Sequence, residues 1–311
     1  MRTSSLESRW HRLARGAPPF LRPEFVLAAA RWTAPAGRPV FASIERGGDL
    51  VAMLPLVVRR GHVVALRGLH APRYDLLGDP AALPALWQRV RDEIPWHTME
   101  LRGVPEGSPL ASELDRLARR DGFAVERAPG SEAPYLPLDS LEPSPPGQLR
   151  RHLTYERVTS ADPLALEDLY RIEEASWTGE ARPEVSTALA QRCFYTELAR
   201  RFACRRRLSL SFLRAGGRRV AAHFALEDRT TSYVLKTACH PAYVASGAGE
   251  ILLVEAGLDA RARGLRELDF LGQDHESRRG WTRPARRHVR LEIYRPTTRG
   301  RAAHALRRLF H

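Results

Sequence analysis

The first half of this 311-residue chain and its second half share one order of predicted elements, at one constant offset in the numbering. Each half contains a glycine pair, Gly47-Gly48 and Gly216-Gly217, between two segments that alternate like strands. The offset between the two pairs also separates the strand-like segment 99–103 from the segment 268–272. Two anchors that share one offset indicate an internal duplication. We therefore expect two similar domains.

Each half mixes strands and helices when its apolar residues are examined for period. The strands are predicted at residues 40–45, 50–58, 62–66, 98–102, 208–214, 220–226, 231–238 and 267–271, and the helices at 24–32, 81–94, 164–177, 185–202 and 250–263. Prolines interrupt residues 128–147, and proline offers no N–H to a helix or a sheet. This indicates an α+β fold of two domains, residues 1–140 and residues 148–311.

Composition excludes several classes of protein. Hydrophobic residues make up 43% of the chain and charged residues 27%, which is typical of folded globular proteins and not of disordered ones. The longest apolar run, residues 50–58, contains Pro55 and is far shorter than the roughly 20 residues that cross a bilayer. The polar N-terminus lacks the apolar stretch of a secretory signal, so we expect a cytoplasmic location. Three cysteines without metal-ligand spacing predict neither a disulfide framework nor a metal site.

The formal net charge of +13 is concentrated near the C-terminus. Residues 276–311 contain 11 arginines and two acidic residues, and such a field attracts phosphates, acidic polymers or anionic lipid. A strand at 287–294 is followed by a short helix from about residue 298. Its apolar side chains share one face, opposite the arginines: Ala302, Leu306, Leu309 and Phe310. We expect so short a helix to dock onto its own domain in preference to a lipid surface.

The segment most informative about chemistry is a strand, a glycine loop and a helix in succession. The strand 231–238 leads to the loop Ser246, Gly247, Ala248 and Gly249, after which a helix begins. Glycines let the backbone approach a phosphate, and the unpaired N–H groups of a first helical turn point at it. The pattern therefore predicts an anion site, although the same glycines also suit a loop that serves turn geometry alone.

The second half resembles the GNAT acyltransferase superfamily. The resemblance rests on residues 246–249 at the start of a helix, on the segment 264–272 and on Trp281-Thr282. Residues 174–179 are also similar to the superfamily's Glu-x-Ser-Trp-Lys-Gly motif. More narrowly, the chain resembles the double-GNAT branch, which includes cellulose-biosynthesis-type acetyltransferases and Fem-type aminoacyltransferases. This implies two tandem GNAT-like domains, each with a mixed, mostly antiparallel sheet flanked by helices, and the motifs are best matched over residues 148–294.

The resemblance implies direct acyl transfer from an acyl-CoA cosubstrate such as acetyl-CoA, with no tightly bound cofactor and no acyl-enzyme. The donor's pyrophosphate is expected on the backbone N–H groups of residues 246–249, and Lys236 is a further candidate for donor binding. The thioester is expected between strands 231–238 and 267–271, which splay apart in this superfamily. The acceptor that is implied is an amine, or a hydroxyl, of a sugar or cell-envelope precursor.

The chain departs from the superfamily's pattern at four positions. Val244 stands where Gln or Arg precedes the glycine loop, and Thr178 stands where Lys follows the tryptophan. His275 and Arg278 stand where an acidic residue and Lys are expected. These departures concern one phosphate contact and the substrate side of the site.

The candidates for catalysis follow the strand that ends at 269–272. His275 is the candidate general base because an ordinary imidazole pKa near 6.5 suits proton removal. Asp274 beside it either orients the substrate or caps the turn. The candidates for acceptor binding are Trp177, Glu174, Arg278 and Trp281.

Four residues have a structural alternative beside the functional one. Glu173 and Glu174 are adjacent on a helix, so at most one of them faces a cleft. His223 alternates out of phase with the apolar residues of its strand, which predicts that it faces the surface or lines a cleft. Cys239 is expected to be a structural thiol and not a nucleophile.

The predicted function is N-acyl transfer from acyl-CoA to a small-molecule acceptor, by positioning and without a catalytic triad. Two alternatives remain open. One is a Fem-type amide transferase that uses aminoacyl-tRNA, which the basic tail favours; the other is a catalytically silent module that binds nucleic acid or an acidic polymer. Weak contact with a membrane surface is compatible with the tail, no transmembrane segment is expected, and the oligomeric state is not predicted.

Overall fold

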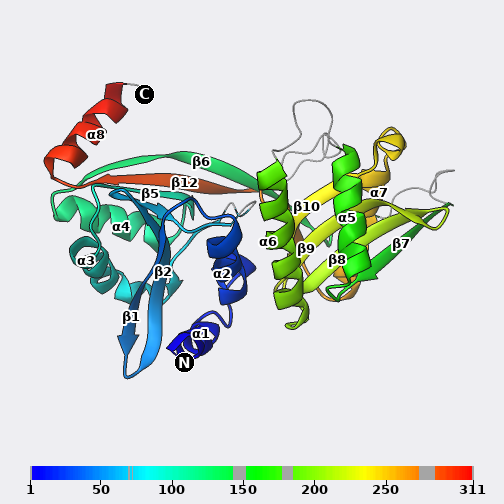
Figure 1. Cartoon of the computed structure of the whole chain (residues 1–311), viewed down its shortest axis with the longest axis horizontal. Helices are drawn as coiled ribbons and strands as arrows, with labels where there is room; N and C mark the ends of the chain where they lie inside the picture. Colours follow the sequence, from blue (N-terminus) through cyan, green and yellow to red (C-terminus); the bar gives the residue numbers. More distant parts are fainter. Residues whose placement is uncertain are drawn as a thin grey trace. The chain divides into compact units, whose positions relative to one another are not determined.

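The computed structural model describes residues 2–68, 71, 73–142, 152–176, 185–272 and 284–309. Contacts within the chain divide it into two compact units. Unit 1 comprises Met1–Glu132 and Arg286–His311, and unit 2 comprises Ala133–Ala285. Each unit combines a mixed sheet with flanking helices, which confirms the predicted α+β class (Figure 1).

The sheet of unit 1 places its strands in an order that differs from their order in the chain. That order is β1 (Arg38–Arg46), β2 (Asp49–Arg59), β3 (His62–Ala65), β5 (Thr98–Pro105), β12 (Ala285–Tyr294) and the first part of β6 (Ala124–Pro137), with β4 (Leu77–Gly78) beside β2. The strands β1, β2 and β3 are antiparallel neighbours, β3 and β5 are parallel, and β12 is antiparallel to β5. Parallel neighbours need a crossover, which here contains helix α3 (Leu83–Glu93).

Two helices, α3 and α4 (Pro109–Arg120), bury their apolar faces in the core of unit 1. Three aromatic side chains, Trp87, Trp96 and Phe123, lie at the centre, with ring centroids 5.2 to 6.1 Å apart. The other helices of this unit within the described residues are α1 (Arg2–Leu13), α2 (Pro23–Trp32), α8 (Thr298–Leu309) and the short 3₁₀ helices η1 (Pro19–Leu21) and η2 (Pro80–Ala82).

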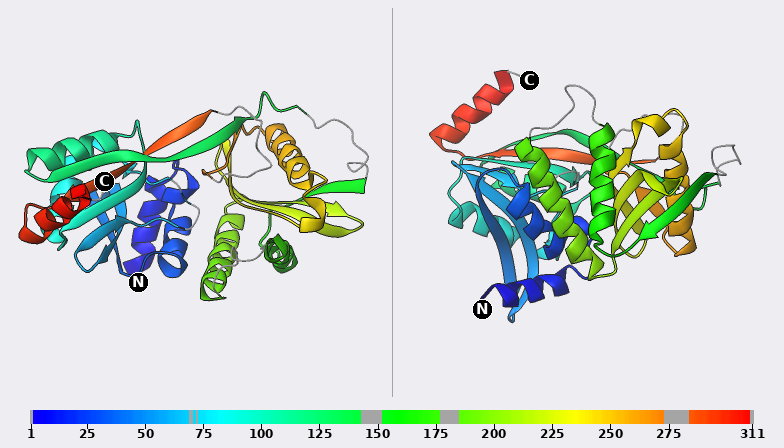
Figure 2. Two further views of the ribbon diagram at one scale, coloured as in Figure 1. Left: turned by 90° about the horizontal axis from the view of Figure 1, so that it is seen from above. Right: turned by 45° about the vertical axis from the view of Figure 1, so that its right-hand side comes forward.

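The sheet of unit 2 is covered by helices on both faces. Its strand order is the end of β6, then β11 (Glu267–Asp269), β10 (Thr231–Cys239), β9 (Arg218–Glu227), β8 (Leu208–Ala215) and β7 (Leu153–Val158). Figure 2 shows α5 (Pro163–Ser176) and α6 (Val185–Ala203) on one face and α7 (Ala248–Ala262) on the other. Strands with two covered faces are buried along almost their whole length. His223 on β9 is therefore only 5% exposed, and the surface position that alternation predicted for it is wrong.

The duplication is visible in the bounds of the elements. The offset between Gly47 and Gly216 also separates the first residues of β2 and β9, of β3 and β10, and of β5 and β11, as well as the last residues of α3 and α7. The hairpin turns correspond as well, because Gly47 and Gly48 have φ of 59° and 85° while Gly216 and Gly217 have 52° and 83°. Two successive positive φ angles are what a two-residue hairpin turn of matching twist requires, and glycine adopts them without strain.

Strand β12 and the end of β6 each pair with a sheet other than the one that the order of the sequence suggests. Strand β12 pairs with β5 of unit 1, with Leu291 opposite Leu101, and its apolar Val289, Leu291 and Ile293 join the core of that unit. Residues 133–137 of β6 pair instead with β11 of unit 2, with Leu136 opposite Leu268. Residues 286–311 thus belong to unit 1, whereas the predicted second domain, residues 148–311, included them.

The start of α4 provides a local test of the fold of unit 1. The buried Ser108 hydroxyl accepts a hydrogen bond from the Leu110 N–H at 3.0 Å and donates one to Asp75. We expect Ser108→Ala to lower the free energy of unfolding by about 1 to 2 kcal/mol, because the helix loses its cap and the half-buried Asp75 carboxylate loses one of its donors. Urea unfolding measures the change. Ser112→Ala, on the exposed side of the same helix, is the control and should stay within about 0.5 kcal/mol of the parent; equal losses would contradict a capping role.

Candidate active site

Strands β10 and β11 part in the middle of the sheet of unit 2. Their parallel register covers Thr231 to Tyr233 of β10, opposite Glu267 to Asp269 of β11. Strand β11 then ends, because the Asp269 carboxylate accepts the Leu271 N–H at 2.9 Å and Leu271 turns into the left-handed region at φ 58°. Strand β10 continues to Cys239, and within the described residues its remainder has no register partner in β11. Pairing between the two strands therefore stops after three residue pairs, because β11 ends there, and the expected splaying stays a prediction.

A β-bulge lies on β10 where the two strands separate. The register against β9 shifts between Val234 and Lys236, so Leu235 is the extra residue. A bulge twists a strand and changes the direction of the side chains that follow it. Here it accompanies the turn of Lys236 toward the face that α5 and α6 cover.

Lys236 is 4% exposed and forms an ion pair with Glu173 of α5. Its ammonium also lies 4.7 Å from the centroid of the Tyr195 ring on α6. Burial lowers the pKa of Lys236, and the Glu173 carboxylate opposes that shift. These contacts are on the face opposite α7, so the structure does not bring Lys236 to the glycine loop, and its part in donor binding stays a prediction.

The adjacent side chains of Glu173 and Glu174 point in different directions, as neighbouring positions on a helix do. Glu173 points to the sheet and Lys236, whereas Glu174 is exposed and pairs with Arg192 of α6. The buried Tyr170 hydroxyl lies nearby, 3.1 Å from the Arg192 carbonyl oxygen and 3.0 Å from the Thr196 hydroxyl. Glu174 was predicted to bind the acceptor, and that role stays a prediction. The Glu173–Lys236 pair was not predicted; its one signal in the sequence is that Lys236 is the only lysine of the chain.

The glycine loop ends at the N-terminus of α7. Gly247 is the N-cap residue with φ 74°, and no side chain caps the helix. Ser246 is exposed, and its hydroxyl donates to the Tyr243 carbonyl oxygen at 2.7 Å, which closes the turn before the helix. A Cβ on Gly247 would meet no atom within 4 Å. Among the described residues no side chain caps the first turn of α7, and the Gly247 N–H donates to the Val244 carbonyl oxygen at 3.0 Å.

The corresponding loop of unit 1 has been closed by its own chain. Gly78 corresponds to Gly247 under the offset of the duplication and also has a positive φ, 103°. A Cβ on Gly78 would lie 2.1 Å from the Val51 carbonyl oxygen, so backbone fills the space in front of it. The Asp79 carboxylate accepts the Ala81 N–H at 2.9 Å, and Pro80 contributes no N–H. At this position unit 1 has a side-chain cap, whereas no described side chain caps α7 of unit 2.

Cys239 and His240, which precede the loop, have structural roles. Burial raises the pKa of the Cys239 thiol against the opposing effect of the Gly249 N–H, so the reactive thiolate is disfavoured. The His240 ring accepts the Ala242 N–H at 3.3 Å and caps the 3₁₀ helix η5 (Pro241–Tyr243). The expectation of a structural cysteine agrees with these contacts. Val244, at the position of the superfamily's Gln or Arg, is exposed.

Most of the residues predicted for the acceptor side lie outside the described part of the chain. They are Asp274 and His275, the candidates for proton transfer, and Trp177, Arg278 and Trp281, the candidates for acceptor binding. Their roles stay predictions. Within the described ranges, no group of three His, Cys, Asp or Glu side chains is arranged to hold a metal ion, and no helix is both long and apolar enough to cross a membrane.

Comparison with known proteins identifies the domain that contains this site. Residues 147–280 match the family model of the acetyltransferase (GNAT) domain. A search of the curated proteins found no match. The solved structures that the chain resembles include the C-terminal domain of a putative lysylphosphatidylglycerol synthetase from Agrobacterium fabrum, at 12% identity and a TM-score of 0.58, covering 97% of this chain and 95% of that one.

Two more solved structures have a similar fold. FemX is 10% identical with a TM-score of 0.60 and covers 89% of this chain and 90% of its own. L-PGS from Bacillus licheniformis is 12% identical with a TM-score of 0.53 and covers 88% and 91% of the two chains. At such identities the likeness concerns the fold alone. Residues 147–280 therefore form a GNAT domain, and the chain as a whole shares the fold of these solved structures.

Proposed function

We propose that the chain is an N-acyltransferase whose unit 2 binds an acyl-CoA donor. The observation that carries the proposal is the N-terminus of α7, which no described side chain caps, beside strands β10 and β11, whose register ends after three residue pairs; the corresponding position in unit 1 is capped by Asp79. The donor's pyrophosphate would lie at the first turn of α7, beside Ser246 to Gly249. The pantetheine arm and thioester would then extend between the two strands.

The reaction is a direct transfer. The nitrogen of the acceptor amine attacks the thioester carbonyl carbon, a C–N bond forms, and the C–S bond breaks as the tetrahedral intermediate collapses. The amine loses one proton to a general base, and the departing CoA sulfur gains one. His275 would be the general base, and Asp274 would orient the substrate. The acceptor, an amine or hydroxyl of a sugar or cell-envelope precursor, would be bound by Trp177, Glu174, Arg278 and Trp281.

Backbone geometry beyond the last paired residues supports this chemistry. The register of β10 with β11 stops at Tyr233, and the pantetheine arm would lie beside β10 beyond that point. Holding the donor and acceptor at attack distance supplies most of the rate acceleration in such a mechanism.

A second candidate is amide transfer from an aminoacyl-tRNA. It is favoured by the fold shared with FemX, by the 11 arginines of residues 276–311 and by the exposed Val244 where a phosphate-binding side chain is expected. In that case the anion at α7 would be a nucleic-acid phosphate.

Thermal unfolding with each donor decides between the candidates. The melting temperature should rise with acetyl-CoA, because a ligand at 100 times its Kd stabilises the folded state by about 2.7 kcal/mol. CoA without the acyl group should give a similar shift, since the diphosphate carries most of the binding. No shift with millimolar acetyl-CoA, together with a salt-sensitive shift with tRNA, would overturn the acyl-CoA proposal in favour of the second candidate. Neither ligand shifting the transition would leave a catalytically silent module.

A further inference from the structure

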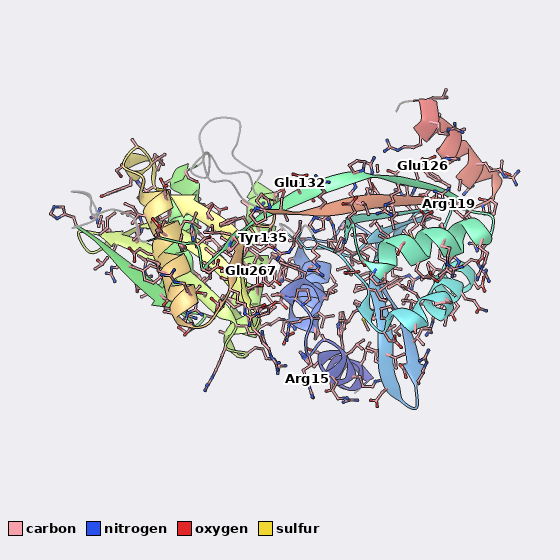
Figure 3. All side chains as sticks on the ribbon, turned by 180° about the vertical axis from the view of Figure 1, so that it is seen from behind. Arg15, Arg119, Glu126, Glu132, Tyr135 and Glu267 are labelled. Atoms are coloured by element: carbon pink, nitrogen blue, oxygen red, sulfur yellow. The ribbon has the colours of Figure 1, made fainter. Side chains whose placement is uncertain are left out.

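Helix α8 of unit 1 contacts its own unit through its polar face. The residues that face inward recur at helical spacing: Gly300, Ala303, His304 and Arg307. His304 lies 2.7 Å from the Glu126 carboxylate of β6, and the Arg307 guanidinium donates to Glu292 of β12 at 2.8 Å. Figure 3 shows Glu126 on β6 close to α8. A Cβ on Gly300 would lie 2.1 Å from the Arg295 carbonyl oxygen, so the helix approaches the chain closely there.

The apolar face of α8 consequently faces solvent. It consists of residues at the same helical spacing on the other side: Ala302, Ala305, Leu306 and Leu309. Leu306 is 56% exposed and Leu309 78% exposed. The helix docks onto its own chain, as its length predicts, but with its faces reversed from the usual arrangement, in which the apolar side is buried.

Exposed arginines lie along both edges of this apolar stripe. Arg301 and Arg308 are on one edge, and Arg299 is on the other. Helix α8 contains no acidic residue, even in its first turn, where a carboxylate would stabilise the helix. An apolar stripe between cationic edges complements a surface with an apolar interior and anionic groups at its boundary.

The charges beside the apolar stripe of α8 indicate which kind of partner can bind it. A second copy of the chain would bring the same arginines against one another, and like charges at close range repel. A nucleic acid would neutralise the arginines but leave two leucines in water. The boundary of an anionic bilayer accommodates both, because leucine side chains enter the acyl region while arginines remain at the headgroups.

We infer that α8 is a peripheral anchor that lies on anionic lipid. The helix is about 18 Å long, so it lies in the interface and does not span the bilayer. Its two leucines enter the bilayer surface, and the exposed arginines contact lipid phosphates. The inference does not depend on acyl transfer, because no residue of the proposed donor site takes part in it.

Vesicle co-sedimentation of the full chain tests the anchor. The protein should sediment with vesicles that contain phosphatidylcholine and phosphatidylglycerol in a two-to-one ratio, and it should stay in solution with phosphatidylcholine alone. The double variant Leu306→Ser/Leu309→Ser should bind at least tenfold more weakly, since two buried apolar side chains are lost. Arg301→Gln/Arg308→Gln should also lose at least tenfold, because each basic residue near an anionic surface accounts for about fivefold in affinity.

Matched controls separate the anchor from general surface effects. Leu164 and Leu189 of unit 2 are equally exposed leucines, so Leu164→Ser/Leu189→Ser should bind vesicles like the parent. Circular dichroism and melting temperature verify that each variant folds. Equal sedimentation with both lipid compositions, or unchanged binding of the Leu306/Leu309 variant, would overturn the anchor. The anchor would also be overturned if the protein formed a dimer that Leu306→Ser/Leu309→Ser abolished. The same holds if the protein bound tRNA through these arginines and the leucines made no difference.

Discussion

Gly249→Asp is expected to abolish acetyl-CoA binding while leaving the protein folded. Gly249 occupies the second position of α7, inside the predicted pyrophosphate site. The new carboxylate would stand where the donor's phosphates are expected. Two like unit charges 4 Å apart repel by about 4 kcal/mol at an effective dielectric constant near 20, which corresponds to a roughly thousandfold loss of affinity.

The same substitution should not harm the fold. A Cβ on Gly249 meets only the Cβ of Cys239, at 3.9 Å, which is ordinary contact. Replacing glycine raises helix propensity, and an acidic side chain in a first turn interacts favourably with the helix dipole. The unliganded variant should therefore be as stable as the parent or up to about 1 kcal/mol more stable. Loss of binding with undiminished stability is a result that misfolding cannot produce.

Isothermal titration calorimetry with acetyl-CoA measures the effect, and Gly249→Ala is the matched control. The alanine variant adds the same Cβ without charge and should keep its affinity within about fivefold, which corresponds to about 1 kcal/mol. If Gly249→Asp bound acetyl-CoA like the parent, the donor would lie elsewhere. If both variants lost binding equally, the effect would be steric and the electrostatic argument would fail.

Glu173→Gln is expected to be strongly destabilising to unit 2. Lys236 is almost fully buried, and Glu173 is its ionic partner, with 15% of its own side chain exposed. Removing one member of a buried ion pair leaves the other charge uncompensated and costs about 3 to 5 kcal/mol. Urea unfolding at pH 7 measures the loss. The adjacent Glu174→Gln removes an exposed carboxylate from the same helix and should change stability by less than about 1 kcal/mol.

The double variant Glu173→Gln/Lys236→Met should recover most of the stability, because neither charge is then buried. The dependence on pH gives a second measurement. Burial already lowers the pKa of Lys236, and removal of Glu173 takes away the group that opposes this shift. The folded variant then releases its proton at a lower pH than the unfolded chain, so its stability rises with pH up to the unfolded pKa of about 10.4. The difference in the free energy of unfolding between the parent and Glu173→Gln should become smaller from pH 7 to pH 10. A difference that stayed constant would contradict this account.

Local sequence patterns were sufficient for the repeated architecture. The glycine pairs at 47–48 and 216–217 fix two hairpin turns because few other residues tolerate successive positive φ angles. Alternation and helical period then place the strands and helices between them, and the offset between the glycine pairs holds from β2 through β5. The start of α7 at the glycine loop was equally predictable, since glycine there permits the left-handed N-cap. Such features depend on the conformations available to a few neighbouring residues.

Tertiary structure alone decided four further points. It assigned β12 to unit 1, because an alternating strand can complete either of two similar sheets and only its register with β5 distinguishes them. It closed the loop at Gly78 with the distant Val51 backbone and left Gly247 open. It paired Lys236 with Glu173, far away in sequence, and it turned the apolar face of α8 outward by bonding His304 and Arg307 to Glu126 and Glu292. Period shows which residues of an element share a face, but what that face meets depends on contacts between residues far apart in the chain.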